Sequence, residues 1–216
     1  MSEKEKNLQE MIDGGVVAIV RVESARQAIE VCGAIARGGI KPIEVTMTVP
    51  GAIDVIKEFK SAMKDKVLVG AGTVLDTETA RAVILAGAEF IVTPTLNLRV
   101  IEMCRRYGKI VIAGAFSPTE ILTAWEAGAD IVKVFPATVG GPQYLQDIRG
   151  PLPQIKLVPT GGVDLENTPD FIQAGAVAVA VGASLVDKTA LSEGRYDLIT
   201  EKAKRFIEAV KLARAG

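Results

Sequence analysis

The chain has 216 residues, and 49% of them are hydrophobic, which is enough for a well-packed core. Its 25 basic and 26 acidic residues form no block of like charge, so the pattern does not indicate a nucleic acid or an anionic membrane as a partner. The sequence contains no histidine, which excludes Ser-His-Asp and Cys-His nucleophiles, histidine acid–base catalysis and the usual zinc sites.

Two further features bear on location and redox chemistry. The apolar runs are of strand length, and the mixed-charge N-terminus precedes no signal-peptide core, so we expect a cytoplasmic protein. Cys32 and Cys104 lie in predicted helices and belong to no CxxC pair. We interpret both as small buried apolar residues.

Short β-branched segments alternate with amphipathic helical segments along the chain, after a leading helix predicted at about Glu3–Gly14. The predicted strands are Val16–Arg21, Pro42–Thr46, Val67–Gly70, Phe90–Thr93, Ile110–Ala113, Ile131–Val134, Lys156–Pro159 and Val177–Val181. The predicted helices are Ala25–Arg37, Ala52–Ala62, Glu78–Ala86, Leu98–Tyr107, Pro118–Ala127, Gln143–Arg149, Glu166–Gln173 and Tyr196–Ala213.

The spacing of these elements predicts the fold. Successive strands begin about 20 to 26 residues apart, the length of one βα unit, and glycine follows several helices where a C-cap is expected. Alternating βα units imply a parallel sheet with right-handed crossovers. Eight short units predict a closed (β/α)8 TIM barrel with an N-terminal helix, in a single domain spanning residues 1–216. An open doubly wound sheet is the alternative, but no GxGxxG motif opens the first helix.

Lys133 interrupts an apolar run, Ile131–Val134, that is typical of a short buried parallel strand. A buried ammonium group is costly unless it is paired or neutralised, and desolvation lowers the pKa of a lysine. Because a neutral amine is a nucleophile, Lys133 is a candidate for Schiff-base chemistry on a carbonyl substrate. The alternative is a lysine that extends to the strand end or pairs with a structural carboxylate.

Glu44 is a carboxylate in another otherwise apolar strand. Active sites of barrels gather at the C-terminal strand ends, and alternate strand residues point inward, so Glu44 and Lys133 are expected to meet near the barrel mouth. There Glu44 is predicted to transfer protons for the Schiff-base chemistry, with a structural Lys–Glu pair as the alternative. Arg21, at the end of the first strand, is expected either to hold a substrate carboxylate or to pair with Glu44.

Glycines follow the third, seventh and eighth predicted strands. Those beside Thr73 are interpreted as letting a ligand approach the backbone, while the threonine hydroxyl donates to it. Loops after strands seven and eight frequently bind phosphate in barrels of this kind. The predicted phosphate contacts are Gly161, Gly162, Gly182 and Ser184, and the predicted contacts of the substrate's carboxylate end are Arg21, Thr73 and Thr160.

Together these segments make the chain resemble the 2-keto-3-deoxy-6-phosphogluconate (KDPG) aldolase family, which also acts on 4-hydroxy-2-oxoglutarate (KHG). The resemblance runs from about Gly15 to Ala213. The matching segments are Ala18–Arg21, Gly39–Thr46, Gly70–Thr73, Gly87–Phe90 with Pro94, Val132–Pro136, Gly150-Pro151, Pro159–Val163 and Gly182–Leu185.

The resemblance implies a homotrimeric (β/α)8 enzyme that cleaves a phosphorylated 2-keto-3-deoxy sugar acid to pyruvate and glyceraldehyde 3-phosphate. Lys133 matches the family's Schiff-base lysine and Glu44 its proton-transferring glutamate. Thr73 matches a pyruvate-pocket residue, and Gly161, Gly162 and Ser184 match the phosphate site. Neither a cofactor nor a metal is expected, because the protonated imine replaces a Lewis acid.

The chain departs from the family pattern at three places. Some members carry an arginine four residues after the glutamate to hold the pyruvate carboxylate, and here that position is Thr48. We hypothesise that Arg21 supplies this charge from the neighbouring strand. Ala113 stands where relatives often have proline. Ala137-Thr138 follow Phe135-Pro136, where many relatives have a glutamate two residues after the proline, so the resemblance does not define the pocket wall or the preferred substrate.

Two other functions remain possible from the residues alone. One is a phosphate-binding barrel without covalent chemistry, such as an isomerase or epimerase. The other is a non-catalytic assembly scaffold built on an aldolase fold. The preferred substrate among KDPG, its galactonate epimer and KHG, and the stereochemistry at C4, also stay open.

Overall fold

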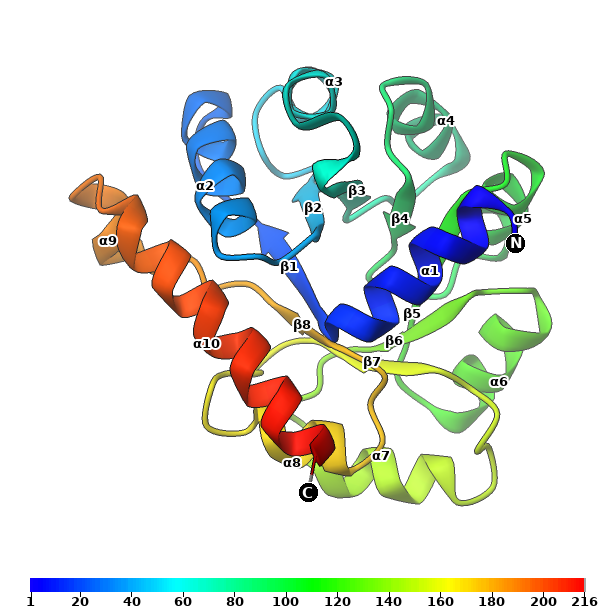
Figure 1. Cartoon of the computed structure of the whole chain (residues 1–216). Helices are drawn as coiled ribbons and strands as arrows, with labels where there is room; N and C mark the ends of the chain where they lie inside the picture. Colours follow the sequence, from blue (N-terminus) through cyan, green and yellow to red (C-terminus); the bar gives the residue numbers. More distant parts are fainter. Residues whose placement is uncertain (216) are drawn as a thin grey trace.

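Eight parallel strands form a nearly closed barrel, and helices surround its outside in the computed structural model (Figure 1). The structure describes residues 1–215, with the backbone alone of Asp65. The strands are β1 (Val16–Val20), β2 (Pro42–Thr46), β3 (Leu68–Gly72), β4 (Phe90–Val92), β5 (Ile110–Ala115), β6 (Ile131–Val134), β7 (Leu157–Pro159) and β8 (Val179–Val181). Each strand pairs with its neighbours in chain order, and β1 pairs with β8.

The helices are α1 (Glu3–Gly14), α2 (Ala25–Arg37), α3 (Ala52–Met63), α4 (Thr77–Leu85), α5 (Leu98–Arg106), α6 (Pro118–Glu126), α7 (Gly141–Arg149), α8 (Thr168–Gln173), α9 (Lys188–Ser192) and α10 (Tyr196–Ala215). A short 3₁₀ helix, η1 (Lys64–Lys66), follows α3. Within residues 1–215 we find no helix with the length and hydrophobicity of a bilayer span.

The barrel closes where β7 meets β8. The N–H of Val177 donates to the carbonyl of Leu157 over 3.0 Å, and Thr160 forms a parallel bridge with Ala180. These bonds join the two ends of the eight-stranded sheet. The predicted (β/α)8 barrel is therefore confirmed.

Alternation along the strands separates two hydrophobic cores. Side chains such as Val17, Leu68 and Ile112 fill the inside of the barrel. Residues of the other parity, such as Val45 and Ala71, pack outward against the helices. Because both faces of each strand are buried, the strands read as nearly continuous apolar runs, and a polar residue within such a strand stands out.

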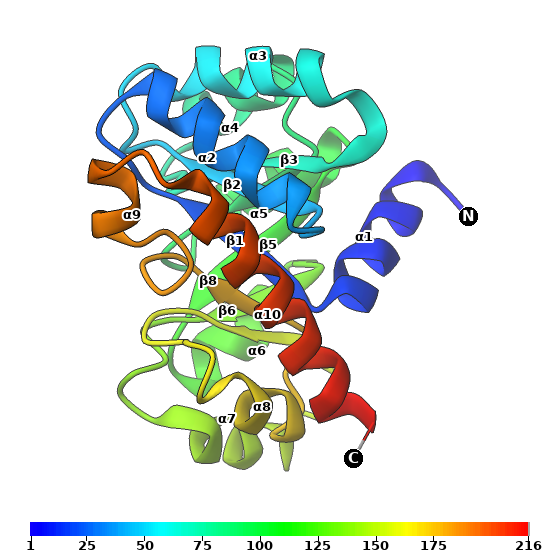
Figure 2. The ribbon, with the colours of Figure 1, turned by 60° about the vertical axis from the view of Figure 1, so that its left-hand side comes forward.

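Helix α1 has the bounds predicted for the leading helix, and it closes the N-terminal end of the barrel. Met11 is fully buried within the inner core, and Lys4 forms a 2.8 Å ion pair with Asp130. Arg214 at the end of α10 donates to the carbonyls of Ile12 and Asp13. Figure 2 shows α1 and α9 at opposite ends of the barrel. The strand ends near α9 are therefore free of this cover.

The predicted boundaries of α1, α2, β2 and β6 agree with the structure, and the other predicted elements differ from it by one or two residues at one end or both. Strand β3 continues to Gly72 because it pairs with β2 as far as Thr46. Helix α8 begins at Thr168 rather than Glu166, because the preceding residues form a hydrogen-bonded loop. Helix α9 and η1 were not predicted, since segments of five and three residues carry too little periodicity.

Both cysteines are fully buried, in agreement with their interpretation as small apolar residues. Burial is the main cause that raises the pKa of each thiol, to about 12 for Cys104. The thiols therefore stay protonated and unreactive at neutral pH.

Candidate active site

A cavity of about 650 Å³ lies at the C-terminal ends of the strands. Its volume is within the range of small-molecule sites. All of the predicted site residues line it: Arg21, Glu44, Thr73, Lys133, Thr160, Gly161, Gly162, Gly182 and Ser184. Six different strands and the loops that follow them thus contribute to one site, while the role of each residue stays a prediction.

Lys133 lies on β6 and is only 7% exposed. Its register partners are Gly114 on β5 and Val158 on β7, so its side chain leaves the strand between small and apolar neighbours. Its Nζ atom lies 5.0 Å from the centroid of the Phe135 ring, which also lines the cavity. Burial lowers the pKa of Lys133, against an opposing effect of the Glu44 charge, and the charge of Arg21 lowers it further.

Glu44 lies on β2 and is 2% exposed. Strands β2 and β6 are four positions apart in the eight-stranded barrel, so Glu44 and Lys133 enter the cavity from opposite sides. Among the described side chains, no carboxylate oxygen lies within 4.0 Å of the Lys133 amine. The geometry therefore does not support a structural Lys–Glu ion pair. Burial raises the pKa of Glu44, and the charges of Lys133 and then Arg21 oppose that rise.

Glycines on β3 and β5 make room for the side chains around the cavity. A Cβ atom on Gly72 would lie 2.2 Å from Oε1 of Glu44, and a Cβ atom on Gly70 would lie 2.3 Å from the ring of Phe90. On β5, a Cβ atom on Gly114 would lie 2.4 Å from the backbone of Pro94. The glycines of β3 were interpreted as allowing a ligand to approach, whereas here they accommodate the protein's own side chains.

Arg21 and Thr73 lie at the rim of the cavity. Arg21 is exposed, and no carboxylate of the described residues pairs with it within 4.0 Å, so the geometry leaves it available to a ligand. Thr73 has a φ angle of +58°, a conformation that costs a β-branched residue energy. Asp76 caps α4, so Thr73 is not held there as an N-cap.

Thr160 follows β7 and is 4% exposed. Its Oγ1 atom is buried without a hydrogen-bond partner among the residues that the structure describes. A buried hydroxyl without a partner is costly, and because Thr160 lines the cavity this hydroxyl is a candidate ligand contact.

The two loops predicted to bind phosphate are held together by side chains. Gly161 and Gly162 both have positive φ angles, of +90° and +74°. The amide Nδ2 of Asn167 donates to the carbonyl of Gly162 over 2.8 Å, and the hydroxyl of Ser184 donates to the carbonyl of Val163 over 2.7 Å. These bonds fix the loop carbonyls and so orient its peptide groups.

Three residues of this region were not predicted as site residues. Asn167 is a structural clamp of the glycine loop, and Asp164 and Lys188 line the cavity. The spacing of Asp164 and Asn167 before a proline is typical of a turn and a helix cap. This pattern predicts a loop but does not indicate a ligand-binding site. Lys188 lies on α9, a helix that was itself not predicted.

No cluster of three or more His, Cys, Asp or Glu side chains with the arrangement of a metal site occurs in the described part of the chain.

The fold and the cavity together define a (β/α)8 barrel enzyme with a buried amine and a buried carboxylate facing one ligand site. A model of the KDPG and KHG aldolase family matches residues 8–202. The chain is 33% identical to a 2-dehydro-3-deoxy-phosphogluconate aldolase of Treponema pallidum over 90% of this chain and 93% of that protein. It is 36% identical to the 2-dehydro-3-deoxy-6-phosphogalactonate aldolase of Escherichia coli over 91% and 96%.

Solved structures agree with this result. A KDPG aldolase of Legionella pneumophila, with pyruvate captured as a covalent carbinolamine, has a TM-score of 0.84 and 28% identity over 91% of this chain and 96% of that one. The chain therefore belongs to the KDPG and KHG aldolase family. It is a class I aldolase, a carbon–carbon lyase.

A substitution at Gly72 tests the placement of Glu44. In Gly72→Ala the new methyl group displaces the flexible end of Glu44. From the predicted role of Glu44 in proton transfer, we expect aldol cleavage to fall about 10- to 100-fold, since a misplaced catalytic group can cost that much. Stability should change little. Gly70→Ala is the matched control, because its methyl group meets the buried Phe90 ring and should instead lower the free energy of unfolding by about 1–3 kcal/mol. Urea unfolding and steady-state kinetics measure both, and equal loss of activity in the two variants would contradict this account.

The titration of Lys133 follows from its surroundings. We expect its amine to lose its proton below the ordinary pKa of a lysine, because burial disfavours the charged form. Glu44→Gln removes a negative charge that raises the pKa of Lys133, so the midpoint should move lower. Arg21→Gln removes a positive charge that lowers the pKa, so the midpoint should move higher.

Competitive acetylation at a series of pH values, read by mass spectrometry of the Lys133 peptide, measures these midpoints. Shifts in the same direction for the two variants would contradict the electrostatic assignment.

Proposed function

We propose that this chain cleaves KDPG to pyruvate and glyceraldehyde 3-phosphate through a Schiff base on Lys133, and that it also cleaves KHG to pyruvate and glyoxylate. The proposal rests on the Lys133 amine, which is only 7% exposed and faces a buried carboxylate across a ligand-sized cavity. Burial lowers the pKa of this amine. A neutral amine in such a place is able to condense with a ketone.

The reaction follows from these two groups. Neutral Lys133 attacks the C2 ketone to form a carbinolamine, which loses water to give an iminium ion. Glu44, through a water molecule, removes the proton of the C4 hydroxyl, and the C3–C4 bond breaks as its electron pair moves into the iminium. The aldehyde leaves, and the enamine that remains is protonated at C3. Hydrolysis then releases pyruvate and restores the amine.

The raised pKa of Glu44 suits it to this role. A carboxyl group that takes up and gives back protons works best when its pKa lies near the working pH. Burial moves the pKa of Glu44 in that direction. The absence of an ion pair within 4.0 Å of Lys133 in the described residues leaves space between the two groups for the substrate.

The remaining residues have proposed roles at the two ends of the substrate. Arg21 holds the carboxylate in place of the family arginine that is Thr48 here, and Thr73 and Thr160 contact the pyruvate part. The unpartnered hydroxyl of Thr160 supports this assignment. Backbone amides at Gly161, Gly162 and Gly182, together with Ser184, hold the phosphate. The hydroxyl of Ser184 bonds to Val163, so its contact with phosphate requires a rotation or the use of its N–H.

The relatives support the substrate class, and assays are needed to identify the preferred substrate within it. The proteins similar to this chain act, by their names, on phosphogluconate, phosphogalactonate or hydroxyoxoglutarate derivatives, at 30% to 36% identity. As part of the same proposal, residues 1–216 act as one catalytic domain in a homotrimer in the cytoplasm. A designed cage of fused symmetric oligomeric domains, 31% identical with a TM-score of 0.86, supports an oligomer.

Borohydride trapping tests the nucleophile. With pyruvate and borohydride, the wild-type chain should gain the mass of a reduced pyruvate adduct on the peptide that contains Lys133. Lys133→Met should lose both this adduct and pyruvate release from KDPG, whereas Lys57→Met, a change at an exposed lysine, should retain both.

A substrate panel of KDPG, its galactonate epimer and KHG completes this experiment. Adduct formation that survives in Lys133→Met would place the nucleophile elsewhere. Turnover of a phosphorylated sugar without any adduct would favour a non-covalent isomerase. No turnover with any member of the panel would favour a scaffold.

Replacement of Arg21 tests the carboxylate contact. We expect Arg21→Ala to raise the KM for KDPG about 10- to 100-fold, because a charge-assisted hydrogen bond contributes about 1.5–3 kcal/mol. Arg21→Lys should recover part of this loss, since it keeps the charge but loses the bidentate geometry. Steady-state kinetics measure the effect, and an unchanged KM in Arg21→Ala would end the hypothesis.

A further inference from the structure

The cavity is lined by five charged side chains, which form two groups. Glu44, Lys133 and Arg21 belong to the reacting end, since the charge of Arg21 acts on the other two groups. Asp164 lies in the loop after β7 and Lys188 at the start of α9 after β8, and both line the cavity together with the glycines predicted to hold the phosphate. Among the described residues, Lys188 is therefore the cation of the cavity that neither the amine chemistry nor the carboxylate contact uses.

Local hydrogen bonds position Lys188 at the cavity. After β8 the chain turns where the N–H groups of Leu185 and Val186 donate to the carbonyl of Gly182. Asp187 then caps α9 by accepting from the N–H groups of Thr189 and Ala190. Lys188 is the first residue of α9 and lies four positions after Ser184.

The adjoining carboxylate does not neutralise Lys188. Asp187 forms its ion pair with Lys202 on α10, over 3.3 Å. In the part of the chain that the structure describes, no carboxylate lies within 4.0 Å of the Lys188 amine. Its charge is thus available to a ligand in the cavity.

The other charge at this end acts against an anion. Asp164 accepts the N–H groups of Glu166 and Asn167 through Oδ1, which fixes its carboxylate in the loop. A phosphate group in this cavity experiences repulsion from the Asp164 carboxylate. A cation at this end of the cavity would offset that repulsion and add to the binding that the backbone amides provide.

We propose that Lys188 is a specificity-determining residue, which supplies the positive charge that selects phosphorylated over unphosphorylated 2-keto acids. This inference rests on the proposed function and deepens it. It assigns the discrimination to one exposed side chain of α9, in addition to the backbone amides of the glycine loops. Because the contact is an exposed charge pair, salt should weaken it.

The experiment compares the wild type with Lys188→Gln, Lys188→Arg and Lys188→Glu. The measured quantity is the ratio of kcat/KM for KDPG to kcat/KM for its unphosphorylated counterpart, 2-keto-3-deoxygluconate. We expect Lys188→Gln to lower this ratio about tenfold at low salt, Lys188→Glu to lower it further, and Lys188→Arg to keep it within about threefold of the wild type. In Lys188→Gln the inhibition constant of inorganic phosphate should rise by a similar factor. The difference between this variant and the wild type should shrink at a salt concentration of about 0.5 M.

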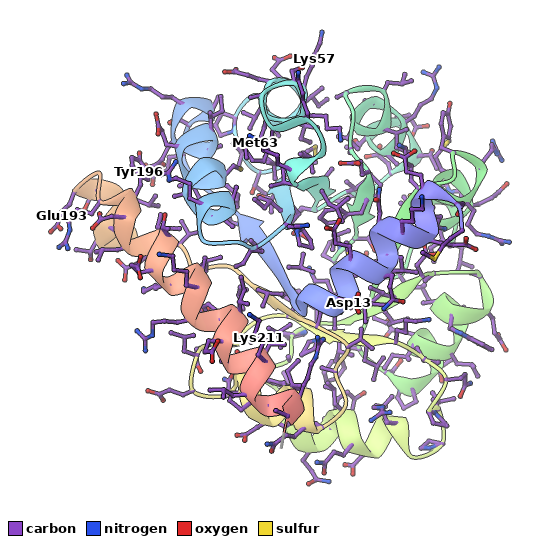
Figure 3. The ribbon with its side chains drawn as sticks, in the orientation of Figure 1. Asp13, Lys57, Met63, Glu193, Tyr196 and Lys211 are labelled. Atoms are coloured by element: carbon purple, nitrogen blue, oxygen red, sulfur yellow. The ribbon has the colours of Figure 1, made fainter. Side chains whose placement is uncertain are left out.

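Lys57→Gln is the matched control, because Lys57 projects outward from α3, away from the cavity, and its loss removes the same charge (Figure 3). This control should leave the ratio unchanged. If Lys188→Gln and Lys57→Gln give the same ratio while the wild type prefers KDPG, the role of Lys188 is overturned and the proposed function stands. If the wild type cleaves neither sugar acid, the proposed function fails and this inference fails with it.

Discussion

The structure is organised around one amine removed from water. Lys133 projects from a strand that is buried on both faces, and at 7% exposure its charged form lacks the hydration that a surface lysine has. An ion pair with Glu44 would stabilise the ammonium group, yet the barrel places the two groups on opposite sides of its mouth. The protein therefore retains a buried base and a buried acid that do not neutralise each other, which is costly for folding and useful for carbonyl chemistry.

Small residues make this arrangement possible. Gly72 leaves the space that the Glu44 side chain occupies, and Gly114 lets the backbone of Pro94 approach the strand that pairs with Lys133. Large apolar side chains, together with Met11 of α1, fill the N-terminal end of the barrel and support these groups. The result is a packed interior at one end and a ligand cavity at the other, within one set of strands.

Much of this could be predicted, for identifiable reasons. The βα spacing and the short apolar runs are local properties, and such patterns predicted the barrel, its leading helix and the burial of Lys133 and Glu44. Strand ends in a barrel converge, so the predicted residues at those ends line one cavity. What local patterns did not reveal were Asn167 and Lys188, because one acts through a bond to Gly162 and the other starts a helix of only five residues. The reason for the glycines of β3 was also missed, since a close approach between neighbouring strands is invisible along a single segment.

The sequence by itself determined the fold class and the kinds of catalytic group that are available. These follow from composition, local periodicity and the lack of histidine, which can all be read along the chain. Only the tertiary structure decided that Lys133 and Glu44 face each other without pairing, that Thr160 keeps an unpartnered hydroxyl, and that Lys188 joins the cavity. These are relations between strands and loops far apart in the chain, and their distances depend on how the barrel closes and on how its strands are staggered.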